Sequence, residues 1–382
     1  MKQPVIQGGM GIGISMGNLA GHVAREGGMG VIAAAGIGFR EPDFYKNPTE
    51  AGKRALKKEI EKARMIAGGN GLIAVNIMTA ASDYESMARA AAEYGADAII
   101  SGAGLPLSLP EYVPEGSAMI APVVSSGRAA KIIMKDWQRH HNRRPDFLVV
   151  EGCKAGGHLG FKPEELLNHT AKSLEENVSD VLKVADGIPV FAAGGVFDRE
   201  DVKRMLSLGA AGVQVGTRFA LSAEGDATQE FKDILLNAED EDVRIITSPV
   251  GMPGRAVVTP LIEKVDSGTR VPPKHCVNCI RVCNPGTTKY CISNALIQAF
   301  YGNYEEGLFF TGSNVGRITQ MQTVAEIMQD LNPNALRICF IGQNLRARGP
   351  GSEYCLPFYQ PGQHSPSQEK SQNGRKHNYD RE

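Results

Sequence analysis

The stretch that decides the fold runs from residue 188 to residue 218: IPVFAAGGVFDREDVKRMLSLGAAGVQVGTR. One apolar run ends in Gly194-Gly195, a polar segment with helical periodicity follows, and a second apolar run ends at Gly216. Both runs are continuously apolar rather than alternating, which is typical of parallel strands covered on both faces. The stretch therefore predicts a strand, a helix and a parallel strand, with glycine at each strand end.

The same unit recurs along most of the chain. Helical periodicity follows most of the apolar runs, at residues 18–26, 49–67, 84–94, 127–140, 170–185 and 199–208, whereas residues 107–113 hold only a short turn. Eight apolar runs precede residue 217, at residues 5–7, 30–34, 72–76, 98–101, 119–123, 147–151, 189–193 and 212–216. An open doubly wound sheet uses the same alternation, but the count and the glycines after many strands favour a (β/α)₈ TIM barrel.

Three regions follow from this pattern. Residues 1–245 are expected to form the barrel, and residues 246–345 a C-terminal helical cap that contains a cysteine cluster and has helices at 293–302 and 318–331. Residues 250–255 have the composition of a loop. Residues 346–382 are rich in Gly, Pro, Ser and charge, so we expect a disordered tail.

The composition of the chain limits which classes of binding partner are expected. The 382 residues carry a formal net charge of −1, so no global field attracts nucleic acid or an anionic membrane. The first residues lack a signal-peptide pattern, and no apolar stretch reaches the length of a membrane helix. We expect a cytoplasmic protein with a small-molecule substrate, no nucleic-acid partner and no membrane contact. The sequence is compatible with a homodimer and does not decide the oligomeric state.

His158 is the candidate catalytic residue. It lies in the loop Glu151-Gly-Cys-Lys-Ala-Gly-Gly-His-Leu-Gly160, directly after the sixth predicted strand. In a barrel the carboxyl ends of the strands form the active face, so this imidazole is exposed to whatever binds there. A neutral imidazole can take or give a proton, or hydrogen-bond a substrate oxygen. A surface or capping role is the alternative.

Two glycine turns predict a phosphate site. Gly195 follows the seventh strand, and Gln214-Val215-Gly216-Thr217 ends the eighth. Barrels commonly bind phosphate with backbone N–H groups at this place. Gly9 and Met10 after the first strand and Asn76 at the end of the third offer amides and a thioether for a heteroaromatic ring.

These motifs, taken in order, resemble the nitronate monooxygenase family, formerly called 2-nitropropane dioxygenases. The closely similar flavin-dependent enoyl-ACP reductases share the landmarks. The motifs that carry the resemblance are Gln7-Gly-Gly-Met10, Val75-Asn-Ile-Met78, the Ala-Gly-Gly-His core of residues 151–160, Ala193-Gly-Gly195 and Gln214-Val-Gly-Thr-Arg218. The resemblance covers about residues 3–265.

The resemblance implies non-covalent FMN, with its phosphate near Gly195 and residues 214–217. His158 would be the catalytic residue. The flavin would contact Gly9, Met10, Asn76, Glu151, Gly156 and Gly157. Glu151 stands where the monooxygenase branch often has Gln, and Lys154 where both branches usually carry another residue, so the charge near the flavin differs.

Several activities stay open. A nitronate monooxygenase would oxidise alkyl nitronates to carbonyl compounds and nitrite with FMN, whereas an enoyl thioester reductase would use NAD(P)H as well. A flavin- or metal-binding sensor without turnover and a phosphate-binding barrel isomerase without flavin are further alternatives. Reduction of the flavin by a nitronate or by a reduced nicotinamide separates the first two.

Four cysteines form a cluster of their own: Cys276, Cys279, Cys283 and Cys291 lie within 16 residues. Four closely spaced thiolates suit Zn²⁺ or a [4Fe–4S] cluster. Unligated thiols that pack the cap are the alternative.

Overall fold

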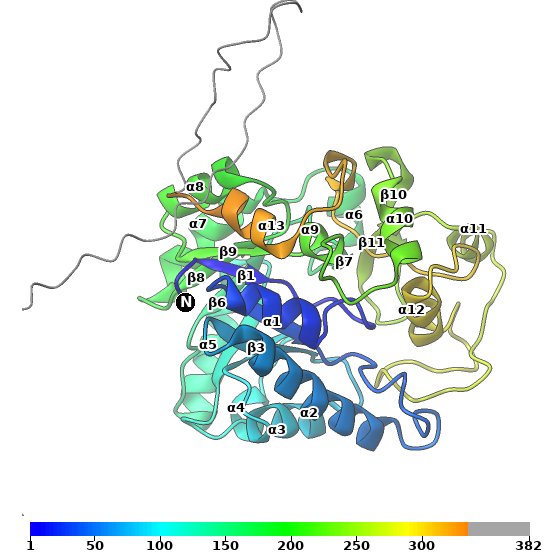
Figure 1. The fold of residues 1–382 in the computed structure, drawn as a ribbon, viewed down its shortest axis with the longest axis horizontal. Coiled ribbons are helices and arrows are strands. Elements are labelled where there is room, and N and C mark those ends of the chain that lie inside the picture. Colours follow the sequence, from blue (N-terminus) through cyan, green and yellow to red (C-terminus); the bar gives the residue numbers. More distant parts are fainter. Residues whose placement is uncertain (335–382) are drawn as a thin grey trace, which may run out of the picture. The chain divides into compact units, whose positions relative to one another are not determined.

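Eight parallel strands close into a barrel in the computed structural model, which describes residues 1–334 (Figure 1). The last of them pairs with the first, because Ile6 of β1 lies beside Gln214 of β9. The barrel is therefore closed, and the prediction of a TIM barrel rather than an open sheet is confirmed. The strands are β1 (Val5–Gln7), β2 (Met29–Ala33), β3 (Leu72–Met78), β4 (Ala98–Gly102), β5 (Met119–Val124), β6 (Leu148–Glu151), β8 (Val190–Ala193) and β9 (Gly212–Val215).

Two apolar layers explain why the strands lack alternation. Inward-facing side chains such as Ile6, Val31, Ile100 and Phe191 fill the barrel interior. The residues between them, such as Val5 and Ile32, face the surrounding helices. Both faces of each strand are thus buried, as continuous apolar runs predict.

The helices of the outer ring follow the predicted order. They are α1 (Gly17–Arg25), α2 (Pro48–Ala67), α3 (Tyr84–Glu93), α4 (Leu109–Tyr112), α5 (Gly127–His141), α7 (Leu174–Ala185) and α8 (Arg199–Ser207). The fourth connection is the single short turn that the sequence predicts. The predicted start of α7 at residue 170 is wrong, because Ser173 and Glu176 form a capping box that begins the helix at Leu174.

The last described helix completes this ring. α13 (Val324–Leu331) begins after the short 3₁₀ helix η2 (Val315–Arg317), and not at residue 318 as predicted. Its buried side chains Val324, Ile327, Met328 and Leu331 join the barrel core, and the helix contacts α1 and α8. It therefore occupies the place of the helix that would follow β9. The helices that directly follow β9 in the chain are α9 (Thr217–Ala220), which also contacts α13, and α10 (Gln229–Leu236).

The structure also contains a small antiparallel sheet that was not predicted from the sequence. β10 (Val243–Thr247) pairs with β11 (Pro253–Val257), and β11 pairs with β7 (Gly157–His158), where Gly254 lies opposite His158. The expectation of a loop at residues 250–255 is wrong from Pro253 onward, because that backbone bonds to both neighbouring strands. The sheet fastens the His158 loop to the C-terminal part of the chain.

The remaining elements are α6 (Pro163–Leu167), the 3₁₀ helix η1 (Asp240–Asp242), α11 (Pro260–Asp266) and α12 (Ile292–Phe300). Residues 1–334 form one compact unit, and β10 spans the expected boundary at residue 245, so the division into barrel and cap stays a prediction. The predicted tail, residues 346–382, lies outside the described residues. In the described part of the chain, every helix is too short or too polar to cross a lipid bilayer.

Candidate functional site

A cavity of about 500 Å³ lies at the carboxyl ends of the barrel strands. This volume is in the range typical of small-molecule sites. Every site residue predicted for catalysis or cofactor binding lines it: Gly9, Met10, Asn76, Glu151, Gly156, Gly157, His158, Gly195, Gln214, Val215, Gly216 and Thr217. The structure thus brings the set together, while the role of each residue stays a prediction.

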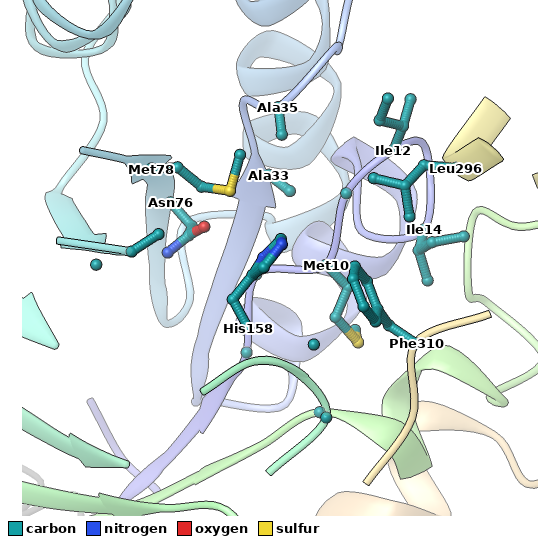
Figure 2. A pocket seen from close by; sticks show the side chains of 18 of the residues that line it. Met10, Ile12, Ile14, Ala33, Ala35, Asn76, Met78, His158, Leu296 and Phe310 are labelled. Carbon is teal, nitrogen blue, oxygen red and sulfur yellow. The ribbon is translucent and has the colours of Figure 1, made fainter. Parts of the chain in front are cut away.

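His158 stands in the middle of this cavity. Figure 2 shows its ring between Asn76 and Met78 on one side and Met10 and Phe310 on the other. Its Nε2 lies 2.8 Å from Ser248 Oγ, and its ring meets the Phe310 ring edge-on at 5.1 Å between centroids. Pairing of β7 with β11 fixes the backbone on which the imidazole stands.

The imidazole is uncharged at neutral pH. Burial by the surrounding protein lowers the pKa of His158 to about 4. Ser248 Oγ accepts the N–H of Val250 at 3.3 Å, so its own hydroxyl proton is available for His158 Nε2. In that arrangement the Nδ1 atom of His158 carries the ring proton and can donate to a bound molecule.

Glu151 provides a second neutral group at the end of β6. Burial raises the pKa of Glu151 to about 8, and no neighbouring charge offsets this effect in the described residues. The side chain is therefore mostly a protonated acid at pH 7. In that form it can donate a hydrogen bond and does not repel an anion.

The backbone around the cavity is shaped by glycine. A Cβ on Gly9 would fall 2.3 Å from Asn76 Cβ, so no larger residue fits there. Gly195 has φ of +111°, a conformation that side chains avoid, and its turn faces the cavity beside Gly216. These turns lie in the cavity wall, and their use as a phosphate site stays a prediction.

Residues 311–314 form a wall that sequence analysis missed. Gly312 N donates to Thr217 Oγ1 at 3.0 Å, and Asn314 Nδ2 to the Gly195 carbonyl at 3.4 Å. Thr311 Oγ1 is buried without a hydrogen-bond partner among the described residues and belongs to the cavity lining. A buried polar atom without a partner is costly, so a bound ligand that satisfies it would be stabilised.

The donor set fits FMN. Neutral donors at Glu151 and Thr311 and the backbone turns at Gly195 and Gly216 suit a phosphate and the polar edge of an isoalloxazine ring. Apolar side chains, including Met10 and Ile12, suit its faces (Figure 2). Lys154 adds a cation here, because its side-chain carbons lie over Gly195, where an added Cβ would come within 3.2 Å of Lys154 Cβ.

The missed residues come from distant parts of the chain. Ser248, Phe310 and Thr311 reach His158 or the cavity only through the small sheet and the segment after it. No local motif marks them. The one signal that predicts a hairpin there is the β-branched composition of Val243-Arg-Ile-Ile-Thr247, followed by a glycine-containing turn.

The cysteine cluster borders the same cavity. Cys279 lines it, whereas Cys276 is exposed and Cys283 and Cys291 are half-buried. Within residues 1–334, no group of three or more His, Cys, Asp or Glu side chains already has the geometry of a metal site. The four cysteines thus stay a predicted ligand set.

The chain is similar to known proteins over most of its described length. A family model described as nitronate monooxygenase matches residues 1–334. A (3aS,4S,5R,7aS)-5-hydroxy-7a-methyl-1-oxo-octahydro-1H-indene-4-carboxyl-CoA dehydrogenase of Mycobacterium tuberculosis is 28% identical over 270 residues, 71% of this chain and 67% of that protein. A probable nitronate monooxygenase of Bacillus subtilis is 29% identical over 199 residues, 51% of this chain and 53% of the relative.

A solved structure extends the comparison. FabK from Thermotoga maritima superposes with a TM-score of 0.68 and 26% identity, over 87% of this chain and 92% of that chain. The alignments with the two curated relatives span about half to two thirds of their lengths.

Proposed function

The chain belongs to the nitronate monooxygenase family, which places it among FMN-dependent oxidoreductases, and we propose that it oxidises alkyl nitronates to carbonyl compounds and nitrite. The observation that carries the proposal is the neutral His158 imidazole, hydrogen-bonded to Ser248 and facing a cavity that fits FMN. FMN, when bound, supplies the electron transfer of the reaction.

The protein contributes positioning and proton handling. His158, neutral at pH 7 and with its ring proton on Nδ1, can donate a hydrogen bond to an oxygen of the nitronate. Glu151 is protonated at the same pH, so it does not repel an anionic nitronate. Phe310 and Met10 lie together on one side of the imidazole and give that side an apolar surface (Figure 2).

A second candidate is oxidoreduction of an acyl thioester with NAD(P)H. The observation in its favour is an apolar side of the cavity, formed by Ile12, Ile14 and Leu296, which suits an acyl group (Figure 2). The name of the Mycobacterium tuberculosis relative also describes a carboxyl-CoA dehydrogenase. Both candidates use the same cofactor and the same histidine.

Anaerobic reduction of the bound flavin separates the candidates. The protein is purified as the holoenzyme and mixed with propyl-2-nitronate, NADH or NADPH while flavin absorbance is followed. Bleaching by the nitronate, with nitrite formed once oxygen is admitted, is the expected result. Bleaching only by a nicotinamide would replace the proposal with the thioester reaction, and a colourless protein that binds no added FMN would overturn both.

A further inference from the structure

The loop that carries the four cysteines is built into the wall of the barrel-mouth cavity. Val277, Asn278, Cys279 and Ile280 line that cavity. The loop is bonded to the segment after β3: Ser82 N donates to the Cys279 carbonyl at 3.1 Å, and Arg281 N to the Ala80 carbonyl at 3.1 Å. Whatever fixes this loop therefore shapes the site.

Regular secondary structure fixes little of this loop. Between α11 and α12 the described backbone has only isolated bridges, Ala81 with Ile280 and Val271 with Tyr290. Ile280 and Tyr290 are buried, and Cys279 and Cys283 pack at the edge of their apolar cluster, but Cys276 is exposed. Because ordering each residue costs about 1–2 kcal/mol, a further tie between Cys276 and the packed part would help to hold one conformation.

The cysteines lie around one small apolar cluster. Cys279 and Cys283 pack against it, and it contains both sequence neighbours of Cys291. Asn278 N donates to Cys276 Sγ at 3.4 Å. A donor of this kind stabilises sulfur in its anionic, ligating form.

Cys291 adds the N-terminus of a helix to this arrangement. It is the N-cap residue of α12, and its side chain makes no capping hydrogen bond. The positive end of the helix dipole favours a thiolate there. The sulfur of Cys291 is thus available to a ligand at a place that stabilises its anionic form.

We propose that Cys276, Cys279, Cys283 and Cys291 bind one thiophilic metal centre, Zn²⁺ or an iron–sulfur cluster, which fixes this loop as a wall of the cavity. The exposed Cys276 moves toward the other three on binding, because the four thiols do not yet surround a metal position. Ligand sites of this kind commonly assemble with the metal, and binding releases the thiol protons. The proposal does not depend on the identity of the substrate.

Metal analysis of the full-length holoenzyme tests the centre. Protein purified without oxygen is expected to contain about one zinc per chain, or about four irons with four sulfides and a broad absorbance near 400 nm beside the flavin bands. The two results distinguish the two centres. Absence of both metals, as purified and after reconstitution with Zn²⁺ or with iron and sulfide, overturns the proposal.

Cysteine variants test the ligand set. Cys283→Ser and Cys291→Ser should each lower the metal content at least severalfold, whereas Cys153→Ser, outside the cluster, should retain it. If a cluster variant fails to fold, competition between the wild-type protein and a chelator measures the same affinity. Full metal content in both cluster variants would contradict the assignment.

Hydrogen exchange tests the structural consequence. Amides of residues 272–291 should exchange more slowly in the metal-loaded protein than after chelation, while amides of α5 should be unchanged. Equal exchange in both states would show that the metal does not fix the wall.

Discussion

The imidazole of His158 combines three properties that rarely coincide in a structural histidine. It faces a cavity, its Nε2 has a hydroxyl partner in Ser248, and burial keeps it neutral. The candidate phosphate turns at Gly195 and Gly216 lie elsewhere around the same cavity. Binding of FMN and turnover should therefore be separable.

His158→Ala should retain FMN and lose turnover by about 10²–10⁴-fold, the usual contribution of a positioned acid or base. Flavin content and steady-state rates measure the two effects. His140→Ala, an exposed histidine on α5, is the control and should change neither. Turnover within a few-fold of wild type in His158→Ala would remove the catalytic role.

Lys154 is the departure from the family pattern with a direct structural consequence. Its carbons lie over the Gly195 turn, so its ammonium group is available to the phosphate of FMN. Lys154→Met should weaken FMN binding about tenfold, which corresponds to about 1.4 kcal/mol, and leave riboflavin binding unchanged. Lys183→Met, on the exposed surface of α7, is the charge-matched control.

Flavin-fluorescence titrations measure these affinities. An equal loss for FMN and riboflavin would mean that Lys154 acts on the cavity shape and not on the phosphate.

Elements with a local signal were predictable, and elements defined by distant pairing were not. Each barrel strand is a continuous apolar run and was predicted to within one residue at each end, apart from β3, which ends two residues later than predicted. β7 has two residues and exists only because β11 lies beside it. The glycines of the site directly follow their strands in the sequence and were predicted as site residues. Ser248 and Phe310 were not, because they reach the cavity only through the pairing of β10 and β11 and the packing of the segment after β11.

The helix α13 was likewise predictable as an element, whereas its place in the fold was not. Its periodicity predicted a helix, but only the fold shows that it closes the outer ring against α1 and α8. Ile327→Ala should lower the free energy of unfolding by about 2–5 kcal/mol, because Ile327 is fully buried in the barrel core. Ile132→Ala, at a 42% exposed position on α5, should cost far less.

Denaturant unfolding of both variants provides the comparison. Equal, small losses would show that α13 is not part of the cooperative core.

The stability of the whole molecule depends on pH through two half-buried groups of the cavity, His158 and Glu151, which act in opposite directions of pH because the charged form of each is disfavoured. Below neutral pH the unfolded chain protonates its histidine more readily than the folded protein protonates His158, so stability falls as pH drops from about 6.5 toward 4. Glu151 acts in the other direction, because the folded protein keeps that proton well above pH 4.5. Between about pH 4.5 and 6.5 the two contributions to the free energy of unfolding therefore oppose each other. Above about pH 6.5 only the contribution of Glu151 still changes with pH.

Glu151→Gln isolates the glutamate contribution. Between pH 4.5 and about 8 the folded wild-type protein binds more protons at this site than the unfolded chain, so its free energy of unfolding decreases as pH rises. Glutamine keeps the shape and does not titrate. The difference in thermal midpoint, variant minus wild type, should therefore increase steadily across this window and level off above pH 8, and calorimetry over a pH series measures it.

Glu164→Gln, on the exposed surface, is the control. A difference that does not change with pH would mean that Glu151 is already ionised in the folded protein, and the cavity would then present a negative charge to the flavin phosphate and to a nitronate.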